Sequence, residues 1–236
     1  MRLCGARRAP VYHGAAALAL ALALGAAAAL ADASRMVVED WSSQPADKRG
    51  IPDGWKGQSW GSPKYDFAIQ QDEGARVLHL KSAGDSSNIN KEVKIDLKEY
   101  PILEWRWKVT ALPAGADLRK KETDDEAAQL YVVFPRFPAA VRSQIIGYVW
   151  DTTAPVGLIS KSTKTGTVTY VVVRSGTADL GRWITERRNV WDDYRRIYGS
   201  DPDEPVGGIS LGIDSDDTKS RAESFFGPIT FLKRSP

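Results

Sequence analysis

Cysteine and histidine are scarce in this sequence. It has one cysteine and two histidines among 236 residues, and Cys4 and His13 both precede residue 32. The remainder of the chain therefore keeps His79 and no cysteine. This composition excludes disulfides, thiol catalysis, Cys/His zinc sites and clustered-histidine metal sites from residues 32–236. It also disfavours a nucleophilic triad, because only a Ser–His79–Asp arrangement could form and no GxSxG motif is present.

A long hydrophobic run occurs once, near the start. The basic segment 1–10 precedes an Ala/Leu stretch from Gly14 to Leu30, and small residues stand at Ala29 and Ala31. This pattern is typical of a secretory signal peptide, residues 1–31, cleaved after Ala31. A membrane anchor fits less well, because the many alanines dilute the hydrophobicity of the leucines. We therefore predict a periplasmic or secreted protein without a membrane span after cleavage.

An excess of positive charge is also lacking once the leader is set aside. Without Arg2, Arg7 and Arg8, the 32 basic residues fall to 29 against 30 acidic ones, a net charge of −1. Such a balance gives no indication of nucleic-acid binding. Residues 32–236 are long enough to bury one substantial core, and we predict that they form a single domain of undetermined oligomeric state.

The rest of the sequence is dominated by short segments in which apolar residues alternate. Turns rich in Gly, Pro, Asp and Ser separate these segments, which favours an all-β sandwich or barrel. The predicted strands are 77–81, 92–97, 102–109, 129–134, 144–150, 167–175, 182–188, 206–213 and 227–233. The exception is NVWDDYRRIYG, residues 189–199. Its capping Asn189, early aspartates, late arginines and final Gly199 predict one short helix near 189–198.

Several motifs in these strands resemble a known family. The run YPILEWRWKV, followed by DDEAAQLYVVF, YVWD, VVVRSG, W-x-x-E-x-RNV-x-x-DY and DSDDT, resembles the exported bacterial proteins catalogued as domain of unknown function 3047. The resemblance covers nearly all of the chain after the leader and implies no activity.

A second resemblance concerns the two ends of the predicted domain. The segments VVEDW and AESFFGPITFLK are similar to the first and last strands of jelly-roll carbohydrate-binding modules. It implies a two-sheet antiparallel β-sandwich, jelly-roll-like, with a structural calcium held by acidic residues of the terminal strands. Glu39 and Asp40 match at one end, whereas Gly227 and Pro228 stand where an acidic residue would be needed.

Strand alternation predicts which side chains form a surface. In 102–109, Trp105 and Trp107 share the apolar face and are assigned to the core. Because successive side chains point to opposite faces, the remaining strands also present a polar, aromatic face. If the strands belong to one sheet, that surface consists of Glu104, Arg106, Gln129, Tyr131, Tyr148, Trp150 and Arg174.

This surface suits a carbohydrate or a related envelope polymer. Aromatic rings stack on sugar faces, and amide, acid and guanidinium groups bind hydroxyls and carboxylates. A solvated face with charges paired across strands is the simplest alternative. A polysaccharide lyase using Tyr131, Arg106 and His79, a glycoside hydrolase using Glu104 and Asp151, and a noncatalytic envelope structural or interaction protein are further hypotheses.

The acidic segment DSDDT raises a separate question. An EF-hand loop starting at Asp214 would need Gly and Glu where Lys219 and Phe225 stand, so that motif is excluded. Asp214, Asp216 and Asp217 follow a predicted strand, and short acidic side chains readily bond to the backbone of a turn. The favoured role is therefore a strand-ending turn. The alternative is an irregular calcium site shared with Asp124 and Asp125, although no cofactor is required.

Overall fold

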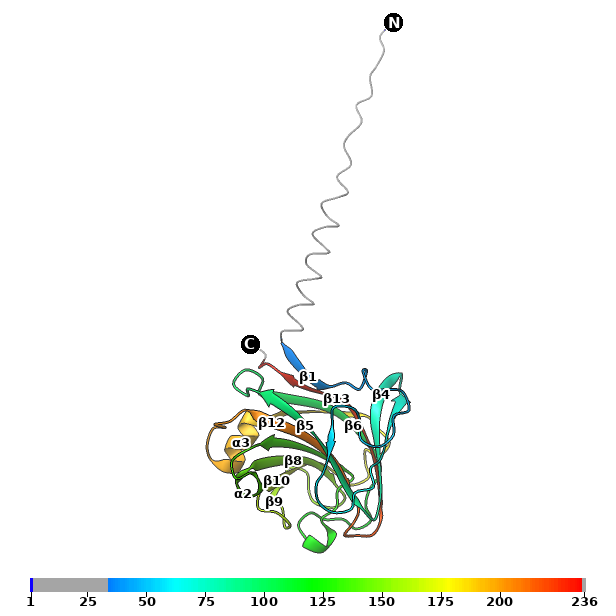
Figure 1. Cartoon of the computed structure of the whole chain (residues 1–236), viewed down its shortest axis with the longest axis vertical. Helices are drawn as coiled ribbons and strands as arrows, with labels where there is room; N and C mark the ends of the chain where they lie inside the picture. Colours follow the sequence, from blue (N-terminus) through cyan, green and yellow to red (C-terminus); the bar gives the residue numbers. More distant parts are fainter. Residues whose placement is uncertain (2–33, 235–236) are drawn as a thin grey trace.

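Two sheets pack face to face to form a β-sandwich (Figure 1). Apart from Met1, the computed structural model describes residues 34–234, and the predicted signal peptide lies outside that range. Sheet A contains β1 (Arg35–Glu39), β3 (Asp66–Asp72), β4 (Ala75–Ala83), β6 (Ile102–Ala111), β11 (Ile184–Asn189) and β13 (Arg221–Leu232). Sheet B contains β2 (Lys56–Gly57), β5 (Ser86–Ile95), β7 (Ala128–Phe134), β8 (Gln144–Asp151), β9 (Ile159–Lys161), β10 (Val168–Ser175) and β12 (Val206–Asp214).

The order of the strands confirms the predicted jelly-roll-like sandwich. Sheet A runs β11-β6-β13-β4-β3, with β1 beside β13, and sheet B runs β2-β5-β12-β7-β8-β10-β9. Neighbouring strands are antiparallel except for the pair β8 and β10, which is parallel. Every predicted strand coincides with an observed one, with shifted bounds. The short strands β2 and β9, and also β3, were not predicted.

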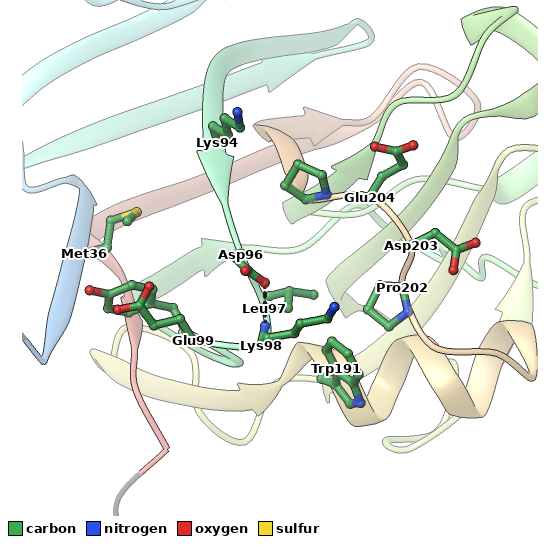
Figure 2. Close-up of a pocket in the computed structure, with 12 residues that line it drawn as sticks. Met36, Lys94, Asp96, Leu97, Lys98, Glu99, Trp191, Pro202, Asp203 and Glu204 are labelled. Carbon is green, nitrogen blue, oxygen red and sulfur yellow. Dashed lines mark hydrogen bonds between the residues drawn. The ribbon is translucent and has the colours of Figure 1, made fainter.

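The predicted helix is present as α3 (Val190–Tyr198), and η1 (Lys121–Thr123) and α2 (Ala139–Arg142) are shorter. The Asn189 side chain accepts a hydrogen bond from the backbone N–H of Asp192, and Gly199 ends the helix with φ 75°. Beside α3 lies a depression of about 380 Å³ (Figure 2). The indole of Trp191 forms part of its wall, together with side chains of both charges from residues 94–99 and 203–204.

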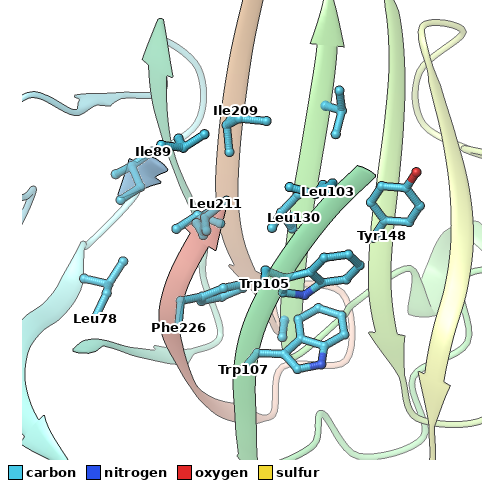
Figure 3. Packing of buried hydrophobic residues seen from close by; sticks show 14 of the residues in the cluster. Leu78, Ile89, Leu103, Trp105, Trp107, Leu130, Tyr148, Ile209, Leu211 and Phe226 are labelled. Atoms are coloured by element: carbon cyan, nitrogen blue, oxygen red, sulfur yellow. The ribbon is translucent and has the colours of Figure 1, made fainter. Parts of the chain in front are cut away.

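Between the sheets lies an aromatic core (Figure 3). Trp105 and Trp107 point inward from β6, as predicted, and are at most 1% exposed. The Trp105 ring stacks on Tyr148 of β8 at a centroid distance of 5.3 Å, and Trp107 meets Phe226 of β13 at 6.0 Å. Burying each large apolar side chain contributes about 1.5–3 kcal/mol, so this cluster joins the two sheets strongly.

The β13 strand is irregular at Gly227 and Pro228. Its register with β6 shifts between Phe226 and Ile229, which leaves both residues out of the ladder. The irregularity suits their chemistry, because proline has no N–H to donate to a ladder. It also lets the Gly227 carbonyl accept a hydrogen bond from the Trp41 indole at 2.9 Å.

Glu39, at the other terminal strand, is held by protein donors. Its carboxylate accepts hydrogen bonds from the Trp55 indole at 3.0 Å and the Lys91 ammonium at 2.9 Å. Lys91 therefore supplies a positive charge beside this carboxylate. Asp40 Oδ1 accepts hydrogen bonds from the Ser42 backbone N–H and hydroxyl.

Candidate functional site

A row of polar side chains runs across the face of sheet B that points away from the aromatic core. We call it the polar strip, formed by Asn88 and Asn90 of β5, Ser210 and Gly212 of β12, and Gln129 and Tyr131 of β7. Strand register aligns Gly212 with Asn88 and Gln129, and Ser210 with Asn90 and Tyr131. The intervening residues Ile89, Leu211 and Leu130 are buried in the core, which is why the strip must face outward.

Gly212 lets two side-chain amides lie close against the backbone in the middle of the strip. The Asn88 Oδ1 and Gln129 Oε1 atoms both lie over this glycine, where any larger residue would collide with them. Both oxygens are buried and have no hydrogen-bond donor in the structure. Unpaired buried acceptors are costly, about 1–3 kcal/mol each, so a hydrogen-bond donor brought to these two oxygens would stabilise them.

Two tyrosines form one wall of the strip. Gly147 of β8 lies under the rings of Tyr131 and Tyr170, and a Cβ built there would meet them at 2.8 and 3.0 Å. Burial raises the pKa of both phenols well above the usual value of 10, so both stay protonated donors at neutral pH. On their far side Leu118 and Ala154, from two loops, cover the outer face of β8 and β10.

At the β5 end of the strip stands an exposed tryptophan. Trp60 is 63% exposed. Its position is fixed by Gln58, which donates from Nε2 to the carbonyls of Trp60 and Ser86 and accepts from the Asn88 N–H. Trp60 was not predicted to be a site residue, although an aromatic residue in the Gly/Ser/Pro segment GQSWGSP was a signal of exposure.

Next to Gln129, the acidic segments 124–126 and 214–217 come together. We call Asp124, Asp125, Glu126, Asp214, Asp216 and Asp217 the acidic cluster. The turn role predicted for DSDDT is confirmed, because Asp214 Oδ1 accepts from the Asp216 N–H at 3.1 Å. Asp125, which was grouped with this segment only in the alternative of a calcium site, lies beside it: its carboxylate accepts from the backbone N–H groups of Asp217 and Thr218.

Burial and crowding change the acidity of this cluster. Burial, opposed by Lys164, raises the pKa of Asp124 to about 6. Burial also raises the pKa of Asp214 to about 8, with Asp216 and Asp125 adding repulsion. Glu126 is fully buried, and its pKa lies well above its usual value for the same reason, with repulsion from Asp124 and Asp214.

Glu126 connects the acidic cluster to the polar strip. Its Oε2 accepts a hydrogen bond from the Gln129 amide at 2.5 Å, whereas its Oε1 has no donor. Lys164, on the turn between β9 and β10, forms ion pairs with Asp217 and Asp216 and donates to the Asp124 carbonyl. Glu126 was not singled out from the sequence because a lone glutamate after two aspartates looks like part of a solvated loop.

The predicted seven-residue surface is wrong, because the strands that carry it belong to two sheets. Glu104 and Arg106 lie on the outer face of sheet A, and Gln129 and Tyr131 lie on the outer face of sheet B. On sheet A, Arg106 pairs with Glu73 at 2.7 Å and Glu104 with Arg187 at 3.6 Å. The outer face of sheet A is therefore a solvated face with paired charges, the alternative considered in the prediction.

The prediction is also wrong for Tyr148 and Trp150, since both lie in the core. The Tyr148 hydroxyl donates to Asp193 at 2.8 Å, and the Trp150 indole donates to the Gly176 carbonyl. Both faces of β8 are apolar because loops cover the outer one, so alternation could not tell which face was inner. Arg174 joins the sheets instead, with ion pairs to Glu186 at 2.6 Å and Asp179 at 3.0 Å.

The residues proposed for catalysis do not converge. His79 and Arg106 lie on sheet A, whereas Tyr131 lies on sheet B, so the lyase arrangement is absent among them. His79 stacks on Phe225 at 4.2 Å and contacts Glu223 at 2.7 Å. Asp151 is fully buried and accepts three backbone hydrogen bonds, on the opposite sheet from Glu104. This separation removes the proposed hydrolase pair.

The sequence matches the family model described as a protein of unknown function (DUF3047) over residues 53–230. The chain belongs to the DUF3047 family. The match includes every residue of the polar strip and of the acidic cluster. No curated protein matches the sequence.

Among solved structures, this DUF3047 member is similar to carbohydrate-binding modules. The family 30 module of a Clostridium thermocellum cellulosomal cellulase has a TM-score of 0.44 at 11% identity, with 86% of this chain and 99% of that one covered. The CBM22-1 xylan-binding domain of Paenibacillus barcinonensis Xyn10C has a TM-score of 0.41 at 10% identity, with coverage of 86% and 98%.

A similar fold also occurs within a larger enzyme. An exo-beta-agarase has a TM-score of 0.40 at 13% identity, and the DUF3047 chain covers only 25% of its length, with 85% of the DUF3047 chain aligned. At such values the likenesses do not bear on function. Within residues 34–234, no helix has the length and hydrophobicity needed to span a bilayer.

Proposed function

We propose that this DUF3047 protein is an exported module that binds a polysaccharide along the polar strip of sheet B. The observation that carries the proposal is the exposed indole of Trp60 at the end of a strip that holds two unpaired amide oxygens. Export is supported by the leader pattern of residues 1–31.

The strip offers the two kinds of contact that sugars need. An indole or a tyrosine ring can stack on the apolar face of a pyranose. Amides and hydroxyls can accept and donate hydrogen bonds to sugar hydroxyls, and the Asn88 and Gln129 oxygens lack protein donors. Both oxygens lie over Gly212, so movement of the two side chains would present them together to a sugar hydroxyl.

A binding module fits this geometry better than an enzyme. Two depressions of the described residues lie elsewhere, beside α3 and beside Arg187 at the edge of sheet A. The strip instead ends at the largely exposed indole of Trp60. Open aromatic surfaces favour binding along a polymer, whereas catalysis needs groups held around a reacting atom in a water-excluding site.

The test is affinity electrophoresis and calorimetry of residues 32–236 against neutral and acidic polysaccharides. Trp60→Ala should weaken binding at least about 10-fold, equivalent to about 1.4 kcal/mol. Trp191→Ala is the matched control, because that indole lines the depression beside α3. Binding that survives Trp60→Ala but is lost in Trp191→Ala would move the site to that depression and overturn the proposal.

A further inference from the structure

We propose that the acidic cluster is a binding site for a divalent cation of the calcium type. Its core consists of Asp125, Asp214 and Asp216, whose carboxylate oxygens lie within 4.8 Å of one another. Ca²⁺ binds oxygens at about 2.3–2.6 Å, so ligands on opposite sides of one ion are about 4.6–5.2 Å apart. One ion can therefore contact all three carboxylates without a change of fold.

A second observation separates this cluster from an ordinary acidic turn. Glu126 is fully buried beside Asp124 and Asp214, yet its Oε1 has no donor. Asp124 is 2% exposed, and its Oδ1 has no donor either. Buried oxygens without donors among neighbouring carboxyl groups are an arrangement that a cation would stabilise and that water-exposed turns do not need.

The carboxyl groups of the cluster also outnumber the cations that pair with them. Six carboxyl groups meet here, and among the described residues Lys164 is the cation that forms ion pairs with them. Its Nζ contacts Asp217, lies 3.8 Å from Asp216 Oδ1 and donates to the Asp124 carbonyl. The lysine therefore neutralises one side of the cluster and leaves Asp125 and Asp214 without a positive partner of their own.

The donor set identifies the class of ion. All side-chain ligands are oxygens, which suits hard cations and not zinc or copper. They come from a loop and a turn, and Ca²⁺ accepts such irregular geometry more readily than Mg²⁺, which needs a near-ideal octahedron. Asp125 and Asp214 already accept backbone N–H groups, which orient their remaining lone pairs.

The experiment measures Ca²⁺ binding by calorimetry and thermal unfolding on chelator-treated protein, residues 32–236. We expect one saturable site, and a 100-fold excess of CaCl₂ over Kd should raise the unfolding midpoint by about 5–10 °C. Asp216→Asn should lose this shift and bind Ca²⁺ at least 10-fold more weakly. Its fold should be kept, because the Asp216 side chain is 42% exposed. Asp201→Asn, an exposed surface change beside Arg195, is the matched control.

Lys164→Gln distinguishes an ion site from a lysine that alone neutralises the cluster. We expect this variant to be less stable than wild type in chelator and to regain wild-type stability in CaCl₂. The proposal is overturned if wild type shows no Ca²⁺-dependent heat, if Asp216→Asn shifts as much as wild type, or if MgCl₂ at equal ionic strength gives the same shift. Failure of CaCl₂ to restore Lys164→Gln overturns it as well.

Discussion

Replacing Tyr148 with phenylalanine should lower stability and leave ligand binding unchanged. The hydroxyl is fully buried and donates to the Asp193 carboxylate at 2.8 Å. Phenylalanine keeps the ring that stacks on Trp105, so the change removes one hydrogen bond to a charged group. Asp193 keeps its contacts with Arg188, at 2.9 Å from Nε and 2.5 Å from Nη2, which limits the damage.

The expected loss follows from the kind of bond removed. A hydrogen bond to a charged group contributes about 1.5–3 kcal/mol. For a chain of this size each 1 kcal/mol shifts the unfolding midpoint by about 2–4 °C, so Tyr148→Phe should unfold roughly 3–12 °C below wild type. Urea unfolding supplies the free energy directly, and differential scanning calorimetry supplies the midpoint.

A second tyrosine serves as the control for this measurement. The Tyr198 hydroxyl donates to a neutral acceptor, the Ile145 carbonyl, at 3.2 Å. Tyr198→Phe should therefore cost only about 0.5–1.5 kcal/mol. A loss below about 0.5 kcal/mol in Tyr148→Phe, or weaker polysaccharide binding with unchanged stability, would refute the assignment of Tyr148 to the core.

Three further variants test other parts of the structure. Burial lowers the pKa of His79, with Glu223 opposing the shift, so the folded state binds fewer protons than the unfolded chain. The free energy of unfolding should therefore fall as the pH drops through 6.5. Urea titrations of His79→Gln should lack the part of this fall that protonation of the histidine causes. Gly212→Ala would force two amide oxygens apart, which should cost about 1–3 kcal/mol in urea unfolding and abolish polysaccharide binding. Arg174→Gln breaks the link to Glu186 on the other sheet and should lower the unfolding free energy by about 1–2 kcal/mol.

Each of these variants has an outcome that would contradict the structure. An unchanged pH profile in His79→Gln would mean that the histidine is solvated. Wild-type binding by Gly212→Ala would mean that the ligand does not contact the two amide oxygens over this glycine. Arg174→Gln with wild-type stability in both low and high salt would mean that its ion pairs contribute nothing to sheet packing.

More of the fold than of the site could be predicted from the sequence. Alternation located nine strands because inward residues such as Trp105 and Leu130 must be apolar in any sandwich. The helix α3 was predicted from its cap residues Asn189 and Gly199 and not from alternation. Strands β2 and β9 are too short to show a period, and β3 carries only three consecutive apolar residues in DFAIQQD.

The alternation of side chains could not predict which sheet each strand belongs to. The pattern of one strand fixes which side chains share a face, and it does not say which sheet receives the strand. Arg106 and Tyr131 were therefore predicted to share one surface, but they lie on the outer faces of opposite sheets. The acidic cluster could be predicted from the sequence, because Asp125 and Asp214 belong to two dense acidic segments. Two such segments repel each other when they pack together unless a positive charge lies beside them.

The separation of buried from exposed indoles gives this protein two optical reporters. Trp105, Trp107 and Trp150 lie in the core, at most 1% exposed, whereas Trp60 is 63% exposed. Emission from the core indoles should shift to longer wavelength only when the sheets come apart. Accessible quenchers such as iodide should act on Trp60 first, and a bound polysaccharide should shield it. One fluorescence sample can thus follow occupancy of the strip and integrity of the core independently.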